Sequence, residues 1–301
     1  MSSLSEQLPT TVIDPASEVG SVALTVADLD RSLAYYTNAL GFQVLQQSDA
    51  DAVLGAAGTP LLVLRQQAGA RPWPTNAVTG LYHFAILLPT RADLGRWLRH
   101  YLAQGLPMPG QGDHLVSEAL YLRDPDEHGI EVYRDRPRSE WHWSNGQVRM
   151  AADPVDIRGL LADAEREGKP WTGLPAGTRL GHIHLQVGDI AQADAFYHGV
   201  LGFDVVASMP QALFVSAGGY HHHVGLNTWH SRGARQAPAE IASLSYYTIT
   251  LPNAAARDAV VARLEAAGYA TERVGDSITV RDPWETVIML QVAGQRSSEG
   301  T

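Results

Sequence analysis

Three side chains on predicted strands have the types and spacing of a metal-binding site. Glu131 lies in the segment HGIEVY, His83 in LYHFAILL and His182 in GHIHLQV. On the strand that contains Glu131, the apolar neighbours Ile130 and Val132 share one face, so the carboxylate points to the other face. Two histidines and one carboxylate form a site for a hard divalent cation with open coordination positions, most characteristically Fe(II) that activates O2. We therefore take these three residues as candidate metal ligands.

Each of these residues also has an ordinary structural explanation. Glu131 alone is most simply a solvated side chain on the wet face of a sheet. His83 alone is most simply a core histidine that is hydrogen-bonded to a backbone carbonyl. For His182 the rival ligand is His184, which lies on the same strand face two residues further on. The metal site is predicted only because the residues occur together.

The bulk composition favours a protein that acts on small molecules. The chain has 301 residues, which is enough for two domains, and its 45% hydrophobic and 18% charged residues are ordinary for a soluble globular protein. A net charge of −10 without a basic cluster argues against nucleic acid and anionic membranes as partners. The absence of cysteine restricts a metal site to N and O ligands. With no signal peptide or membrane-spanning run, we expect a cytoplasmic protein.

The predicted elements follow one plan that occurs four times. After Gly20, an alternating strand leads to Asp28 as a helix N-cap, and the helix that follows stops at Gly41. In the second half, HIHLQVGDIAQADAFYHGVLGFDVV matches VALTVADLDRSLAYYTNALGFQVL, and SYYTITLP matches YHFAILLP. Arg281-Asp282-Pro283 likewise matches Arg123-Asp124-Pro125. Units of about 50–60 residues that recur in this way predict a repeat architecture.

This repeat predicts how the chain is divided. The stretch between the two halves contains Trp141, Trp143 and a predicted helix from Pro154 to Glu167, and we expect it to pack on a domain. The predicted boundaries are 1–18 for a loosely ordered N-terminal tail, 19–137 for a first domain with units 19–75 and 80–137, 138–179 for the connector, 180–292 for a second domain with units 180–230 and 243–292, and 293–301 for a C-terminal tail.

With these motifs the chain resembles a known superfamily. Four such units, the strand HIHLQV, the helix end FYxxxLGF and the segment DPDEHGIEVYRDRP are similar to the vicinal-oxygen-chelate superfamily, which comprises glyoxalases, bleomycin resistance proteins and extradiol dioxygenases. The similarity covers about residues 20–292, and the bacterial two-domain catechol 2,3-dioxygenases resemble the chain most. The resemblance implies an α+β fold of four βαβββ modules that form two half-open barrels.

The resemblance also implies where the ligands lie. In the extradiol branch, one histidine comes from the first strand of one unit, and a histidine and a glutamate come from the first and last strands of its partner. Only unit 3 with His182 and unit 2 with His83 and Glu131 offer these residues. The matching positions in units 1 and 4 hold Ser21, Tyr246 and Met289. We therefore predict that unit 2 pairs with unit 3 and unit 1 with unit 4, with a single metal between the halves.

The resemblance implies two catalytic side chains next to these ligands. Tyr121 precedes Glu131 by ten residues and lies on the neighbouring predicted strand. Together with His114 it resembles the tyrosine and histidine that stand beside the catechol in this family. We expect both residues in the active site.

The segment GGYHHHVGLNTW supplies a further candidate. His223 resembles the family's acid–base histidine, which takes a proton from the substrate and returns it later. If Gly225 occupies the position of Glu131 in unit 2, strand alternation directs His223 and His221 inward and His222 outward. The alternative is a solvated, histidine-rich strand end. Further candidates for the substrate pocket are His184, His221 and Tyr247.

Together these features imply an enzyme. The family resemblance implies an Fe(II)-dependent extradiol dioxygenase of aromatic hydrocarbon catabolism, with Mn(II) as the other metal that the site accommodates. It would use O2 to open a catechol to a 2-hydroxymuconate semialdehyde type of product, and it would form a homo-oligomer. Three alternatives remain: cleavage of a hydroquinone, an oxygen-independent glyoxalase-like or thiol-transferring metalloenzyme, and a non-enzymatic binding module.

Overall fold

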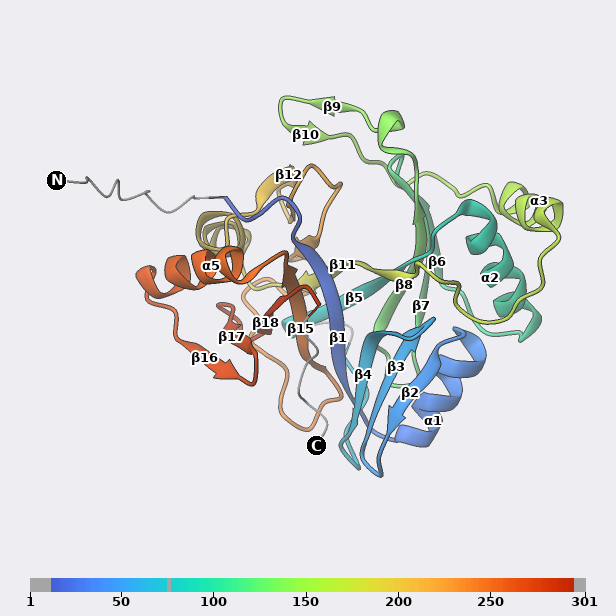
Figure 1. Cartoon of the computed structure of the whole chain (residues 1–301), viewed down its shortest axis with the longest axis horizontal. Coiled ribbons are helices and arrows are strands. Elements are labelled where there is room, and N and C mark those ends of the chain that lie inside the picture. The colour runs from blue at the N-terminus through green and yellow to red at the C-terminus, as the bar shows by residue number, and fades with distance from the viewer. Residues whose placement is uncertain (1–11, 75–76, 295–301) are drawn as a thin grey trace.

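The computed structural model describes residues 12–74 and 77–294, and four units of one plan follow one another along it (Figure 1). The first unit comprises β1 (Glu18–Val26), α1 (Leu29–Ala34) with its π-helical continuation η1 (Tyr35–Ala39), β2 (Gln43–Gln47), β3 (Asp51–Ala56) and β4 (Thr59–Gln66). The second comprises β5 (Gly80–Leu87), α2 (Arg91–Ala103), β6 (Gly110–Asp113), β7 (Ser117–Arg123) and β8 (Gly129–Asp135). The predicted βαβββ modules are thus confirmed in the first half.

The connector and the second half continue this order. The connector holds the short 3-10 helix η2 (Arg138–Glu140), the hairpin of β9 (Trp143–Ser144) and β10 (Gln147–Val148), and α3 (Ile157–Glu167). The third unit comprises β11 (Arg179–Gln186), α4 (Ile190–Ala193) with the π-helical η3 (Asp194–Val200), β12 (Asp204–Met209), β13 (Ala212–Ser216) and β14 (Val224–Asn227). The fourth comprises β15 (Leu244–Leu251), α5 (Ala254–Ala266), β16 (Thr271–Val274), β17 (Ser277–Arg281) and β18 (Val287–Val292).

The strands form two eight-stranded sheets, and each sheet combines units from both halves of the chain. One sheet has the order β16-β17-β18-β15-β1-β4-β3-β2, and the other has β12-β13-β14-β11-β5-β8-β7-β6. The joints are the antiparallel pairs β1–β15 and β5–β11. The predicted exchange, unit 2 with unit 3 and unit 1 with unit 4, is therefore confirmed. Each sheet contains strands from before residue 137 and from after residue 180. The predicted division of the chain into two domains at these residues stays a prediction.

Local sequence explains where the helices begin and end. The N-cap side chain accepts a hydrogen bond from the backbone N–H three residues on at Asp28, Thr90, Asp189 and Asn253. The helical segments of the first and third units stop before Gly41 and Gly202, whose φ angles of 85° and 86° suit glycine. The apolar pattern predicts one α-helix in the first unit, but its second part is π-helical.

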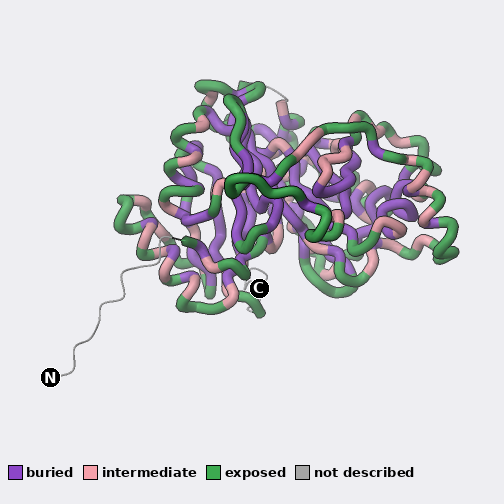
Figure 2. Tube along the Cα trace, turned by 90° about the horizontal axis from the view of Figure 1, so that it is seen from above, coloured by how far each residue is buried: buried purple, intermediate pink, exposed green. Residues whose placement is uncertain are grey.

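The apolar core lies on the helix side of both sheets and is continuous between them. Ile130 and Val132 of β8 and Phe84 of β5 belong to this core, and all three are buried. Figure 2 shows the buried stretches concentrated in the interior of the molecule, with exposed stretches at the periphery. Because side chains alternate along a strand, Glu131 points away from the core, to the inner face of the curled sheet.

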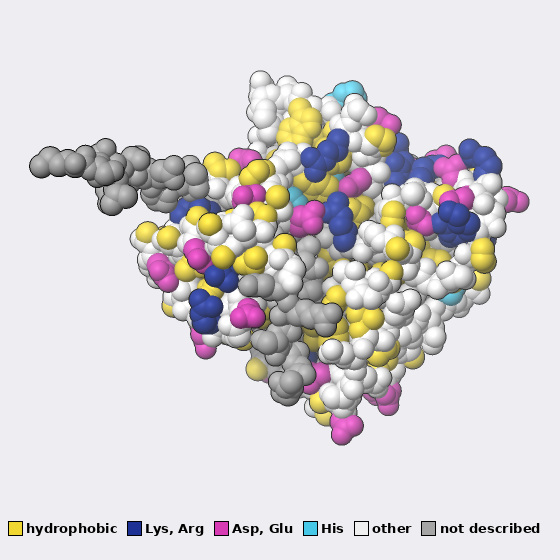
Figure 3. All heavy atoms as spheres, in the orientation of Figure 1, with side chains coloured by type: hydrophobic (Ala, Val, Ile, Leu, Met, Phe, Trp, Pro, Cys, Tyr) yellow, Lys and Arg dark blue, Asp and Glu magenta, His cyan; other side chains and the backbone are white. Residues whose placement is uncertain are grey.

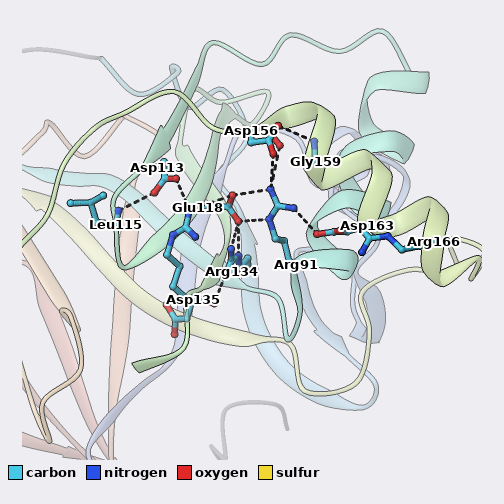
Figure 4. A network of polar contacts seen from close by, with 11 residues as sticks. Arg91, Asp113, Leu115, Glu118, Arg134, Asp135, Asp156, Gly159, Asp163 and Arg166 are labelled. Carbon is cyan, nitrogen blue, oxygen red and sulfur yellow. Dashed lines mark hydrogen bonds and ion pairs between the residues drawn. The ribbon is translucent and has the colours of Figure 1, made fainter. Parts of the chain in front are cut away.

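The connector packs on the first half, as expected. Leu160 and Ala164 of α3 are buried, and a Cβ on Gly95 of α2 would lie 2.0 Å from the Leu160 carbonyl oxygen. Glycine at this position therefore permits the close approach of the two helices. Polar contacts join the same elements (Figure 4).

The polar network is centred on Glu118 of β7, which is 1% exposed. Its carboxylate accepts hydrogen bonds from Arg91 at 2.8 and 3.1 Å and from Arg134 of β8 at 2.6 Å. Arg91 also donates to Asp163 of α3 at 2.5 Å. Charge-assisted bonds of this kind are strong, and here they tie the connector helix to the sheet beneath the site.

Replacing Glu118 should destabilise the protein. In Glu118→Ala, Arg91 and Arg134 lose their shared carboxylate, and we expect the free energy of unfolding to fall by about 3 kcal/mol. The control Glu127→Ala removes an ion pair with Arg123 in which the glutamate side chain is 49% exposed, and about 0.5 kcal/mol or less should be lost there. Urea denaturation measures both values. Equal losses in the two variants would contradict a special role of the network.

Two tyrosine–aspartate hydrogen bonds hold consecutive units together. Tyr36 of η1 donates to Asp124 at 2.8 Å, and Tyr197 of η3 donates to Asp282 at 2.9 Å. Each aspartate lies in the turn before the last strand of the following unit. In the first pair, His128 also contacts Asp124 at 2.8 Å. Unit 1 thus contacts unit 2, and unit 3 contacts unit 4, although the two members of each pair belong to different sheets.

The Asp124–His128 pair makes stability depend on pH. Burial alone would lower the pKa of His128, but the charge of Asp124 outweighs it, so that the pKa is raised above its ordinary value. A histidine with a raised pKa in the folded state contributes stability below its unfolded pKa of about 6.5 and loses it as pH rises through the folded pKa. We expect the free energy of unfolding of wild type to exceed that of His128→Gln by about 1.5–3 kcal/mol near pH 6, and by less at pH 9.

Urea midpoints of the two proteins across this pH range measure that difference. The slope of the urea curves should stay equal in both proteins, so that midpoints report stability. A difference that stays constant or grows with pH would show that the histidine does not act through its charge.

The N-terminal end of the described part packs on the third unit. Ile13 is 2% exposed and its backbone N–H donates to the Gly202 carbonyl at 2.8 Å. Residues 12–17 of the predicted loose N-terminal tail are therefore held against the third unit, whereas residues 1–11 lie outside the described residues. Of the predicted C-terminal tail, residues 295–301 lie outside them as well.

Two surface properties bear on partners. Among the described residues, the helices are too short or too polar to cross a bilayer. On the face shown in Figure 3, basic and acidic side chains are interspersed. This distribution agrees with the expectation of small-molecule ligands.

Candidate metal centre

The structure brings His83, Glu131 and His182 together on the inner face of the second sheet. One potential ligand atom from each lies within 4.8 Å of the others. The Nε2 atoms of His83 and His182 lie 3.0 and 3.1 Å from the same oxygen, Oε2 of Glu131. All three side chains are buried, at 6%, 2% and 1% exposure for His83, Glu131 and His182. These residues are positioned to bind a metal ion.

Strand pairing explains this convergence. Ala85 of β5 lies opposite Glu131 of β8 on one side and opposite His182 of β11 on the other. His83 precedes Ala85 by two residues and therefore shares its face. The small side chain of Ala85 leaves space between the three ligands. His184, the rival of His182, pairs with His83 instead and is not part of the triad.

The electrostatics of the triad suit a cation. Burial alone would raise the pKa of Glu131, but His182 and His83 outweigh it and hold the pKa well below its usual range, so the carboxylate is ionised. Burial lowers the pKa of His83 although Glu131 opposes the shift, which favours the neutral imidazole that a metal requires. The buried Nε2 of His83 has no partner with hydrogen-bond geometry. A buried ligand atom whose one close contact, with Glu131, lacks hydrogen-bond geometry fits a bound metal.

Tyr121 and His114 stand next to the triad, as predicted. Tyr121 lies opposite Glu131 in the β7–β8 pair, and its ring is 5.5 Å from that of His83. His114 Nε2 lies 2.7 Å from the Tyr121 hydroxyl, and Nδ1 lies 2.7 Å from the Ala151 carbonyl. Because a carbonyl only accepts, Nδ1 carries the proton in neutral His114 and Nε2 accepts from Tyr121. Burial, reinforced by Glu131, raises the pKa of Tyr121 well above its usual value, so the phenol stays protonated.

Comparison with known proteins gives the same picture. Residues 18–132 and 179–290 match the model of the Glyoxalase/Bleomycin resistance protein/Dioxygenase superfamily. The chain belongs to this superfamily. It is 49% identical over 277 residues to a catechol-2,3-dioxygenase of Bacillus subtilis (strain 168), covering 91% of this chain and 96% of that protein. The resemblance inferred from the motifs is therefore confirmed.

Solved structures share the fold of this superfamily member at low sequence identity. A putative dioxygenase from Bacillus subtilis subsp. subtilis str. 168 has a TM-score of 0.65 at 12% identity, covering 94% of this chain and 87% of that one. Glyoxalase I from Zea mays has a TM-score of 0.56 at 16% identity, covering 91% and 92%. At these identities the likeness concerns the fold alone.

The histidine run is oriented differently from the prediction. The ring of His222, expected to point outward, lies 4.2 Å from that of His182. His223 accepts a hydrogen bond from the Ala217 N–H at 3.1 Å, and its ring lies against Tyr220. Gly225 does oppose His184 as Glu131 opposes Ala85. The alternation fails because β14 begins only at Val224, and the backbone of residues 221–223 before it is irregular, with bends at 221 and 223.

Burial and neighbouring side chains lower the pKa values of His222 and His223. Burial, with the nearby His182 and His221, holds the pKa of His222 well below its usual value. Burial, with the nearby His221 and Arg179, lowers the pKa of His223 to about 3. Both rings are therefore neutral near pH 7.

An aromatic wall, which the sequence did not reveal, adjoins the triad. It consists of Tyr82, His184, Phe214 and Trp229. Tyr82 reaches this face through a bulge in β5, because His83 and Leu81 pair with the consecutive residues His184 and Leu185. A Cβ on Gly225 would lie 2.9 Å from the His184 ring, so the glycine provides space for it. Nothing in the strand pattern indicated the bulge.

Tyr247 is not brought to the triad. It lies on β15 in the other sheet, where it is fully buried and opposes Val22 and Ile288. In that sheet, Tyr246 and Met289 pack with Ala23 in a small apolar cluster. Among residues 12–74 and 77–294, the triad is the one group of three candidate metal ligands that we find. The prediction of a single metal site agrees with this arrangement.

Removing a ligand should abolish metal binding. We expect Glu131→Ala and His182→Ala each to weaken metal affinity by more than about 100-fold, beyond the 10–100-fold effect of losing a supporting hydrogen bond. The exposed His230 provides the control, because His230→Ala leaves the triad intact. Calorimetric titration of metal-free protein with the metal measures the affinities. Unchanged affinity in either ligand variant would contradict the assignment.

Proposed function

We propose that this chain is an Fe(II)-dependent extradiol dioxygenase that opens a catechol with O2 to a 2-hydroxymuconate semialdehyde type of product. The observation that carries the proposal is the buried triad of His83, Glu131 and His182. Two imidazoles and one carboxylate leave open positions and characterise O2-activating ferrous sites. The similarity to a Bacillus subtilis catechol-2,3-dioxygenase supports the same chemistry. Manganese(II) is the other metal that this ligand set accommodates.

Ferrous iron, when bound by the triad, would supply the redox and Lewis-acid chemistry that joins O2 to the diol. The protein residues around it bind the ring and hold protons. Phe214, Tyr82 and Trp229 offer flat apolar surface, which suits an aromatic substrate better than a small aliphatic one. We assign the substrate to the side of the triad that this wall adjoins.

His222 is the residue that we assign as acid–base group, in place of His223. Its ring is in contact with that of His182, and Nδ1 is engaged by His221 at 2.9 Å. The other ring nitrogen, Nε2, therefore remains for a proton of the diol. Tyr121, held by His114, presents its phenol oxygen on the opposite side of the triad, next to Glu131. The proposed site thus has a proton acceptor and a polar hydroxyl on different sides of the ligands.

Two further parts of the proposal concern the cell rather than the site. We propose a cytoplasmic homo-oligomer that acts in aromatic hydrocarbon catabolism. A composition free of cysteine supports the cytoplasmic location, and the family resemblance supports the homo-oligomer and the role in catabolism. Gel filtration with light scattering tests the oligomeric state.

Oxygen uptake tests the reaction. Protein loaded anaerobically with Fe(II) should consume one O2 per catechol, with a yellow product formed in step. Glu131→Ala, treated in the same way, should show neither signal. If iron-loaded wild type consumes O2 with hydroquinone but not with catechol, hydroquinone replaces catechol as the proposed substrate. A lack of uptake with every diphenol would overturn the dioxygenase and favour an oxygen-independent glyoxalase-like reaction, or a binding module if no metal is held.

Comparing His222 with His223 tests the acid–base assignment. We expect His222→Phe to lower kcat by about 10²–10⁴-fold, the usual contribution of a positioned acid–base group, with its iron content unchanged. His223→Asn should stay within about threefold of wild type, because His223 bonds to the backbone of Ala217 instead of facing the triad. Steady-state kinetics and iron analysis measure both effects. The reverse pattern would restore His223 as the acid–base residue.

A further inference from the structure

A chain of hydrogen bonds leads from Asp135 through His221 to His222. His221 Nε2 lies 2.9 Å from Oδ1 of Asp135, and His221 Nδ1 lies 2.9 Å from Nδ1 of His222. His221 is fully buried and His222 is 8% exposed. The side chain of Asp135 is 22% exposed, so the chain runs from the protein surface to the triad.

The acceptor at one end sets the tautomer of both imidazoles. A carboxylate only accepts, so Nε2 of His221 carries the proton. A neutral imidazole has one N–H, and Nδ1 of His221 must then accept from His222. His222 therefore carries its proton on Nδ1, and its Nε2 is left with a lone pair. With the opposite tautomer, this nitrogen would hold a proton and could not act as a base.

Neighbouring side chains hold Asp135 in place. The Tyr220 hydroxyl donates to the Asp135 carboxylate, with distances of 3.1 and 3.0 Å to its two oxygens. Its oxygen lies 2.7 Å from the hydroxyl of Tyr133, which can donate to it. A Cβ on Gly181 would lie 1.7 Å from the Tyr133 hydroxyl oxygen, so glycine is required there. The carboxylate thus has a built environment and is not a loose surface group.

The same strand carries the metal ligand and this support. Glu131, Tyr133 and Asp135 alternate along β8 and share the inner face. The ring centroid of Trp141, in the connector, lies 5.3 Å from that of His221, and the ring centroid of Tyr220 lies 4.2 Å from it. The connector tryptophan, which the reaction itself does not involve, therefore helps to enclose the histidine.

We propose that Asp135 and His221 are positioning residues that fix His222 in the tautomer whose Nε2 can accept a proton from the diol. This inference rests on the proposed function. In the step concerned, the O–H bond of the diol breaks and an N–H bond forms at Nε2 of His222, while the electron pair stays on the diol oxygen. The positive charge gained by His222 is offset by Asp135 through His221. The proton later returns from His222 to the ring-opened product, so the two proton transfers need no further acid or base.

Substitution of Asp135 separates this role from simple support of the fold. In Asp135→Asn, the amide can donate to Nε2 of His221, which reverses the chain and puts a proton on Nε2 of His222. We expect kcat for ring cleavage to fall at least about 100-fold, with KM within about threefold of wild type. Asp135→Glu retains a carboxylate and should recover at least a tenth of wild-type kcat. Asp204→Asn, an exposed site with the same change in charge, should leave kcat unchanged.

Nitrogen NMR of 15N-histidine-labelled, metal-free protein reads the tautomers without any activity. We expect His222 protonated on Nδ1 in wild type and on Nε2 in Asp135→Asn, with equal thermal unfolding temperatures in both. His222 protonated on Nε2 in wild type, or an Asp135→Asn variant with unchanged tautomer or near-normal kcat, would overturn the inference. Wild-type tautomers as expected in a protein that cleaves no diol would instead contradict the proposed function.

Discussion

The antiparallel pairing of β5 with β11 is the constraint on which the metal centre depends. His83 and His182 come from strands that are about 100 residues apart in sequence, and Ala85 lies opposite both His182 and Glu131. A shift of this register by one residue would turn His182 to the apolar face and Ile183 to the inner face. The core residues Phe84 and Ile183 resist such a shift, because both are fully buried on the helix side. Packing on one face therefore maintains the ligand geometry on the other.

β8 links the metal centre to the rest of the molecule through its two faces. On the inner face it carries Glu131, Tyr133 and Asp135, and on the outer face Arg134 binds Glu118. The ion pairs on the outer face anchor the connector, and the connector in turn covers His221 with Trp141. A strand held from both sides in this way is a rigid platform, which suits the proposed site because its candidate ligands and proton acceptor would have to stay in fixed positions.

Four related units build the fold, but one pair alone keeps a complete ligand set. The inner positions of the other sheet hold Ser21, Tyr246 and Met289, none of which forms a site with neighbouring acids or histidines among the described residues. The structural contacts of that pair have nevertheless been retained, since Tyr197 bonds to Asp282 as Tyr36 bonds to Asp124. The second pair therefore serves as a scaffold, and β1 of its sheet contacts β11 beside the metal centre.

Sequence alone determined the repeat, and together with the family resemblance it predicted the three candidate ligands and the exchange of units, because one pairing alone completes the expected ligand set. The family resemblance also indicated Tyr121 and His114, which the residue pattern by itself did not single out. Only the tertiary structure decided that His222, and not His223, faces the triad, because the bends before β14 interrupt the alternation. The bulge that turns Tyr82 inward and the contact of Asp135 with His221 likewise depend on how distant strands meet, which local residue patterns do not encode.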